Sequence, residues 1–134
     1  GAVLAQLGVP DMRVPIRLAL TYPNRAENPA EPLDLLRCGP LTFDAPDEEA
    51  FPCFRLAKQA AQTGGTACAV LNGANEVAVD AFLHEKIPFG AIARLVEETM
   101  QAVPVITHPT LEQVFECDRA ARQKAAALMS RFEA

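Results

Sequence analysis

Proline is the feature that most restricts how this chain can fold. Eight of the eleven prolines lie in residues 1–52, and only Pro88, Pro104 and Pro109 follow. Proline has no backbone N–H and clashes with the preceding turn of a helix, so it is excluded from helix interiors. The distribution therefore predicts an extended or looped first third and a largely helical remainder.

The proline-rich part begins with an apolar run at residues 2–7, Ala-Val-Leu-Ala-Gln-Leu. A continuous apolar run of this length is typical of a strand that is covered on both faces. Because a single strand has no partner for its backbone groups, we expect it to pair with another chain or with a sheet formed by strands upstream. A short helix capped by Asp11 follows, so residues 1–20 form a first segment. Residues 21–46 lack periodicity and are predicted to be a linker.

Residues 47–134 carry the patterns of four amphipathic helices with short loops. Their expected spans are about 49–63, 69–86, 90–103 and from Thr110 onward. The last begins with Thr-Leu-Glu-Gln, which matches a capping box, and Gly64-Gly65 ends the first. The third and fourth helices each carry one apolar face: Ile92, Leu95, Val96, Thr99, Val103, and Val114, Cys117, Ala121, Ala125, Leu128, Phe132. The predicted fold is mainly α: a four-helix bundle preceded by an extended linker and an N-terminal strand left over from an α/β domain.

The second of these helices contains the most distinctive stretch, residues 69–82. Asn72 stands where an N-cap is expected, and Glu76 adds negative charge near the positive helix end. Two asparagines, Asn72 and Asn75, beside a glutamate at a helix entrance are compatible with a polar site. Capping alone accounts for Asn72 and Glu76, so we favour the interpretation of the stretch as a capped, buried helix. The pattern assigns Asn72, Asn75 and Glu76 no role beyond capping.

Composition excludes several classes of function. The net charge is −5 and no run of basic residues occurs, so nucleic acid and anionic membranes are poor partners. No apolar run has the length of a membrane span. The chain contains no glycine-rich dinucleotide or phosphate-binding loop, and its four cysteines lack the spacing of a zinc site. We interpret the cysteines as buried free thiols of a cytoplasmic protein.

Two classes of protein remain: a free-standing helical module for interaction or oligomerisation, and part of an enzyme whose chemistry lies upstream. The orphan strand and the missing start methionine favour the second.

Four segments together resemble one enzyme family in order and spacing. They are AQLGVPDMRVPI (5–16), YPNR (22–25), LTF (41–43) and LNGANEV (71–77). They resemble the C-terminal part of 1-deoxy-D-xylulose 5-phosphate reductoisomerases. The resemblance implies an NADPH-dependent, homodimeric enzyme of non-mevalonate isoprenoid biosynthesis that needs Mg²⁺ or Mn²⁺. It also implies that residues 1–20 end the central catalytic domain, that 21–46 link it to a bundle at 47–134, and that the rest of the same enzyme is the main partner.

The same resemblance assigns Pro10 and Met12 to the nicotinamide end of the cofactor pocket. A polarizable thioether packs well on a flat ring, although Met12 is equally compatible with filling a core beside a strand end. No residue of the chain matches a catalytic residue or a metal ligand of the family. We therefore expect these 134 residues to be inactive alone and to support the catalytic domain.

Overall fold

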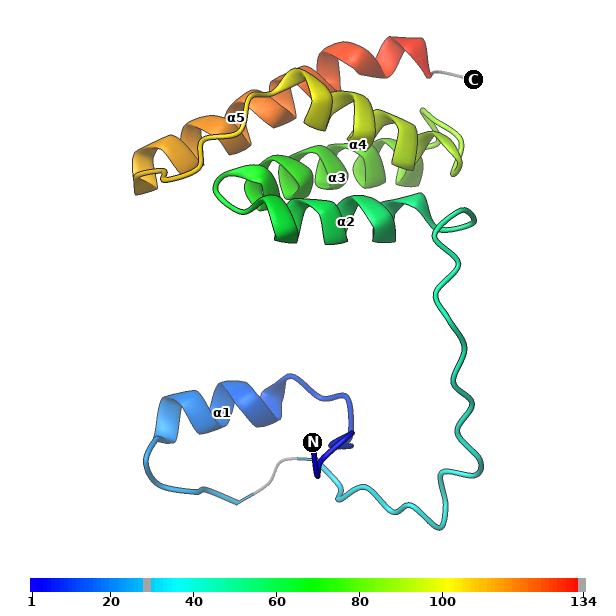
Figure 1. The fold of residues 1–134 in the computed structure, drawn as a ribbon, viewed down its shortest axis with the longest axis vertical. Helices are drawn as coiled ribbons and strands as arrows, with labels where there is room; N and C mark the ends of the chain where they lie inside the picture. The colour runs from blue at the N-terminus through cyan, green and yellow to red at the C-terminus, as the bar shows by residue number, and fades with distance from the viewer. Residues whose placement is uncertain (28–29, 133–134) are drawn as a thin grey trace. The chain divides into compact units, whose positions relative to one another are not determined.

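The computed structural model describes residues 1–27 and 30–132, and it divides the chain into two units, residues 1–45 and 46–134. Every regular element in the described residues is a helix (Figure 1). The expectation of a mainly α chain is therefore confirmed.

The first unit contains one helix, α1, Arg13–Thr21. None of the described residues of this unit is buried. Its large apolar side chains are exposed, among them Val3, Leu4, Leu7, Ile16, Leu20, Leu36 and Phe43. Among residues 1–27 and 30–45, no hydrophobic core forms. These residues therefore lack the burial of apolar surface that is the main force stabilising a fold.

The predicted strand at residues 2–7 is absent from the structure, which gives these residues no regular secondary structure. A strand is stabilised by hydrogen bonds to a neighbouring strand, and the described residues contain no other strand to provide them. An apolar sequence pattern shows where a strand can form, but it does not supply the neighbouring strand that the hydrogen bonds require.

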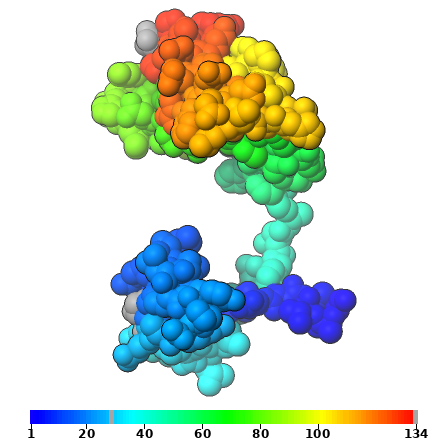
Figure 2. All heavy atoms as spheres, turned by 90° about the vertical axis from the view of Figure 1, so that its left-hand side faces the viewer, coloured from blue at the N-terminus to red at the C-terminus, as the bar shows by residue number. Residues whose placement is uncertain are grey.

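The second unit consists of α2 (Pro52–Thr63), α3 (Ala67–Leu83), α4 (Ala91–Ala102) and α5 (Leu111–Leu128), followed by a 3₁₀ helix, η1 (Met129–Arg131). Successive α-helices run in alternating directions (Figure 1). Helix α3 packs against α2, α4 and α5, and α4 also packs against α5. The space-filling view shows α4 and α5 in close contact on the face turned to the viewer (Figure 2). The core of this unit thus forms around α3.

Small residues allow α3 and α5 to approach closely. Ala74 and Ala78 of α3 and Ala121 and Ala125 of α5 are fully buried. At Gly73, an added Cβ would lie 2.9 Å from the Asp118 carboxylate and 3.1 Å from the Asp118 backbone carbonyl oxygen. Side chains with few atoms at these positions let the two backbones pack at short range.

The two predicted apolar faces are confirmed. Ile92, Leu95, Val96, Thr99 and Val103 are all buried. On α5, Cys117, Ala121, Ala125 and the following Phe132 are buried, and Val114 and Leu128 are partly so. The prediction that all four cysteines are buried is wrong, because Cys38 and Cys68 are exposed and Cys53 is only partly covered. Cys38 lies outside the helices, in the unit that buries none of its described residues. Cys53 of α2 lies at the edge of the core, and Cys68 lies on an exposed position of α3.

The connection between α2 and α3 requires glycine. Gly65 has a φ of +57°, and a Cβ at this position would lie 2.1 Å from the backbone carbonyl oxygen of Ile106. The next residue, Thr66, is buried, and its backbone N–H donates to the same oxygen at 3.0 Å. Its Oγ1 accepts a hydrogen bond from the Ile106 N–H at 3.0 Å. The loop before α3 is thereby joined to the loop before α5.

This contact also shows why the predicted cap of α3 is wrong. The N–H of Val70 donates to the Thr66 carbonyl oxygen at 3.0 Å, so the helix has started before Asn72. Asn72 lies in the second turn and its side-chain amide donates to Glu76 Oε1 at 3.0 Å. The start of α3 is fixed by Thr66 and a residue forty positions away, which local sequence does not reveal.

The start of α5 is confirmed. Thr110 is the N-cap, its Oγ1 accepts from the Gln113 N–H at 3.3 Å, and Gln113 Oε1 accepts from the Thr110 N–H at 2.9 Å. This reciprocal pair satisfies two backbone donors that the first turn leaves free.

Candidate functional site

The turn that precedes α1 contains both residues predicted to bind the cofactor. The backbone carbonyl oxygen of Val9 accepts from the Asp11 N–H at 2.8 Å, and the Asp11 carbonyl oxygen accepts from the Val14 N–H at 3.1 Å. The Asp11 carboxylate accepts from the Arg13 N–H at 2.9 Å. Asp11 therefore holds the backbone on both sides of Met12 and orders the first turn of the helix.

A charged pair reinforces this turn. Arg13 Nε lies 3.0 Å from each carboxylate oxygen of Asp11, and Arg13 donates a further hydrogen bond of 2.5 Å through its terminal nitrogen. These bonds lower the pKa of Asp11 to about 2, and they raise the pKa of Arg13. Asp11 is thus ionised at every pH near neutrality, and the turn keeps its geometry there.

The structure places Pro10 and Met12 on this one turn. Both are exposed, and 69% of the Met12 surface is accessible. Met12 therefore does not fill a core within the described part of the chain. Pro10 and Met12 thus leave an apolar pyrrolidine ring and thioether accessible on this turn, and a ligand pocket would need further walls to enclose a ligand.

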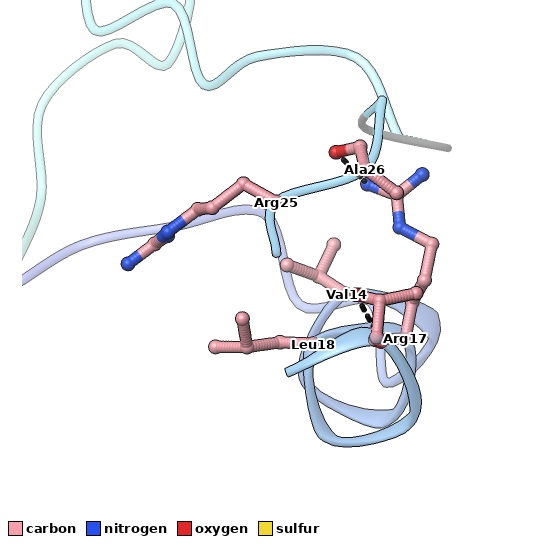
Figure 3. A pocket seen from close by; sticks show the side chains of 6 residues that line it. Val14, Arg17, Leu18, Arg25 and Ala26 are labelled. Carbon is pink, nitrogen blue, oxygen red and sulfur yellow. Dashed lines mark hydrogen bonds between the residues drawn. The ribbon is translucent and has the colours of Figure 1, made fainter. Parts of the chain in front are cut away.

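A cavity of about 310 Å³ lies in the same unit, between α1 and the segment that follows it (Figure 3). Val14 and Leu18 form its apolar wall. Arg17 donates to the Ala26 carbonyl oxygen at 3.1 Å, while Arg25 extends away from Arg17. No sequence motif signals this cavity, because its lining combines α1 with Arg25 and Ala26 of the segment that follows the helix.

The second unit contains a polar network around the distinctive stretch of α3. Arg122 of α5 lies 2.8 Å from Glu76 Oε2 and 2.8 Å from Asp118 Oδ2, and Asn72 donates to Glu76. The hydrogen bond from Arg122, and then that from Asn72, lowers the pKa of Glu76. All of these groups reach the surface, so the network joins α3 to α5 and does not enclose a ligand.

Within residues 1–27 and 30–132, no three His, Cys, Asp or Glu side chains are placed to hold a metal ion. Among the described helices, none combines the length and hydrophobicity needed to cross a bilayer.

The fold defines the class of protein: a small helical domain, residues 46–134, preceded by a segment, residues 1–45, that exposes Pro10 and Met12 on a turn. The family model of the DXP reductoisomerase C-terminal domain matches residues 7–124, and the chain belongs to this family.

Curated relatives and solved structures agree with this assignment. The 1-deoxy-D-xylulose 5-phosphate reductoisomerase of Ectopseudomonas mendocina is 53% identical over 98% of this chain and 33% of the relative. That of Pseudomonas syringae is 56% identical over 91% of this chain and 31% of the relative. The Zymomonas mobilis enzyme in complex with NADPH has a TM-score of 0.80 at 49% identity, covering 94% of this chain and 33% of that one. A reductoisomerase with NADPH, fosmidomycin and magnesium has a TM-score of 0.78 at 42% identity, covering 95% and 33%. The chain thus spans about a third of the length of its relatives.

Proposed function

We propose that the chain is the C-terminal third of a reductoisomerase that rearranges 1-deoxy-D-xylulose 5-phosphate and reduces the resulting aldehyde with NADPH to 2-C-methyl-D-erythritol 4-phosphate. This reaction belongs to non-mevalonate isoprenoid biosynthesis. The observation that carries the proposal is the family match over residues 7–124, which is supported by 53% identity across 98% of the chain. A cytoplasmic homodimer that uses Mg²⁺ or Mn²⁺ is part of the same proposal.

In this proposal, three segments of the chain have different roles. Residues 1–20 complete the central catalytic domain, and the apolar run at 2–7 pairs with that domain's sheet. Residues 21–46 are the linker, and residues 47–134 form a four-helix bundle that supports the catalytic domain. The two units differ in burial, and this difference supports the proposal. None of the described residues between 1 and 45 is buried, whereas the second unit buries a hydrophobic core. Exposed apolar side chains are stabilised when a partner covers them.

Within this arrangement, Pro10 and Met12 contribute an apolar wall at the nicotinamide end of the NADPH pocket. Both side chains are exposed on a turn that Asp11 and Arg13 hold in place, so they fit a flat ring. The bound cofactor supplies hydride, and these residues exclude water beside the ring. The metal and the catalytic groups belong to the part of the enzyme outside this chain, so the chain alone is expected to be inactive.

A chimeric enzyme, called the joined enzyme from here on, tests the proposal. In it, the chain replaces the corresponding C-terminal third of the Ectopseudomonas mendocina enzyme. NADPH oxidation is measured with 1-deoxy-D-xylulose 5-phosphate and Mg²⁺. We expect substrate-dependent oxidation by the joined enzyme and none by the chain alone or by the truncated relative. A folded joined enzyme without activity would contradict the proposal, and so would turnover by the chain alone.

A further inference from the structure

The turn around Met12 covers a charged group and exposes apolar ones. The Asp11 side chain is only 16% accessible, whereas Pro10 and Met12 on either side of it are exposed. Within residues 1–20, all of which the structure describes, only Asp11 and Arg17 are partly covered. Apolar groups are usually the ones removed from water, so the reverse order is informative. Asp11 belongs to the framework of the turn, and Met12 belongs to its accessible surface.

The Asp11 carboxylate closes a ring around the Met12 backbone. Its Oδ1 accepts from the Arg13 N–H at 2.9 Å, so the residue before Met12 is bonded to the residue after it. Such a bond is the side-chain equivalent of a tight turn, and it restricts the backbone angles of the enclosed residue. Met12 has a φ of −64° and a ψ of −18°, and its carbonyl oxygen accepts from the Ile16 N–H at 3.2 Å. These bonds fix the direction in which the Met12 side chain leaves the backbone.

Arg13 holds the carboxylate in the orientation that this ring requires. Its Nε lies 3.0 Å from each carboxylate oxygen, and its terminal nitrogen donates to Oδ2 at 2.5 Å. A guanidinium bound at two points fixes the plane of a carboxylate as well as its position. Arg13 remains 71% accessible, and an ion pair this close to the solvent adds little to stability. The consequence of the pair therefore lies in the geometry of the turn.

The geometry matters because methionine is a flexible side chain. Met12 has three rotatable side-chain bonds and 69% of its surface is accessible. These bonds become ordered when a ligand covers the thioether, and that ordering opposes binding. A backbone that is already fixed keeps the cost to the side chain alone. If the backbone of Met12 moved as well, the same contact would be weaker although every atom of it remained.

We propose that Asp11 is a positioning residue for NADPH: its carboxylate, oriented by Arg13, holds the Met12 backbone so that the thioether meets the nicotinamide ring. The inference rests on the proposed function and on the contact of Met12 with the cofactor. Asp11 acts through Met12 and does not touch NADPH itself. Removal of the Asp11 carboxylate therefore has an effect only while position 12 carries a side chain to be placed.

A double-mutant cycle in the joined enzyme tests this dependence. The variants are Asp11→Ala, Met12→Ala and the combination of both, and steady-state kinetics are measured with varied NADPH. We expect Asp11→Ala to raise KM for NADPH about fivefold, which is the size expected for the loss of one hydrogen bond. In the Met12→Ala background the same substitution is expected to raise KM by less than about twofold, because residues that act as a unit are not additive. The value of kcat should stay within about twofold.

Two further variants serve as controls. Asp11→Asn keeps a side-chain oxygen that can accept from the Arg13 N–H, and it is expected to restore KM for NADPH to within about twofold of the unsubstituted joined enzyme. Asp34→Ala is the matched control elsewhere in the first unit, since Asp34 Oδ1 accepts from the Leu36 N–H at 2.9 Å, also two positions along the chain. Its KM is expected to equal that of the unsubstituted joined enzyme.

Several outcomes would overturn the positioning role. An unchanged KM in Asp11→Ala is one. An equal rise in both backgrounds is another, because Asp11 would then act independently of Met12. A lower kcat with an unchanged KM would mean only that less of the enzyme is folded, and an equal rise in Asp34→Ala would mean that any such turn has the same effect. Activity of the unsubstituted joined enzyme decides the proposed function separately, so either proposal can fail without the other.

Discussion

Thr66 shows how much of this fold depends on one buried hydroxyl group. Its backbone and side chain form two hydrogen bonds with Ile106, each of 3.0 Å, and they join the loops that precede α3 and α5. If the Thr66 hydroxyl is removed, the partly buried Ile106 N–H loses its acceptor and water does not fully replace it, which destabilises the fold.

Thr66→Val is expected to lower the free energy of unfolding by about 1–3 kcal/mol, because valine keeps the shape and leaves the Ile106 N–H without an acceptor. Thr66→Ser keeps the oxygen and is the matched control, with a smaller loss from the missing methyl group. Urea unfolding followed by circular dichroism measures both. Equal stability of the valine and serine variants would show that the hydroxyl contributes nothing.

Glu76 predicts a pH dependence of stability. Its pKa in the folded state lies below the ordinary value of 4.5, chiefly because of the hydrogen bond from Arg122. The ionised form therefore stabilises the fold fully above pH 4.5, and this contribution is lost as the pH falls through the lowered pKa. Wild type should melt above Glu76→Gln at pH 7, and the difference should shrink below pH 4.5.

The control for that measurement is Glu116→Gln, an exposed carboxylate of α5 outside the network. We expect its melting midpoint to follow the wild type across the same pH range. A difference between wild type and Glu76→Gln that persists unchanged at pH 3 would rule out the ion pair as its cause.

The proposed contact of Met12 with NADPH can be tested at the level of one side chain. In the joined enzyme, Met12→Ala is expected to raise KM for NADPH by about tenfold, because burying a side chain of this size contributes roughly 1.5 kcal/mol. Met12→Leu retains most of the apolar volume and should stay close to wild type. Steady-state kinetics with varied NADPH measures both, and an unchanged KM in the alanine variant would remove Met12 from the pocket.

At the scale of elements, local sequence predicts a helix boundary well where local atoms form it. Thr110 and Gln113 satisfy each other's backbone within one turn, and the predicted start of α5 is confirmed. The start of α3, in contrast, depends on the contact between Thr66 and Ile106. Local sequence does not reveal that contact, and it predicts a cap at Asn72, which lies within the helix. The strand at residues 2–7 was predicted from its apolar pattern, but a strand also needs a neighbour.

The cap of α5 can be tested by itself. Thr110→Ala is expected to reduce the free energy of unfolding by about 0.5–2 kcal/mol through loss of the side-chain acceptor for the Gln113 N–H. Thr110→Ser retains the hydroxyl and should lose much less. Thermal unfolding followed by circular dichroism gives the comparison, and a fully stable alanine variant would mean that the capping box is dispensable here.

At the scale of the whole molecule, the two units differ in how they are stabilised. The second unit buries a continuous core that includes Leu56, Ala78, Leu95, Ala125 and Phe132. The first unit has one helix of nine residues and no buried residue among those described. A helix of that length is marginal in water without tertiary packing. We therefore expect residues 46–134 to be stable in the chain itself, and residues 1–45 to become stable only when the remainder of the proposed enzyme covers them.

Amide hydrogen exchange with peptide mass spectrometry tests this claim most directly, on the chain alone and in the joined enzyme. In the chain alone, peptides from α3, α4 and α5 should exchange at least about a hundredfold more slowly than unstructured peptides, and peptides from residues 1–45 at nearly the unstructured rate. In the joined enzyme, peptides covering residues 2–7 and α1 should become protected as well. Protection of residues 1–45 equal to that of α3 in the chain alone would contradict the account.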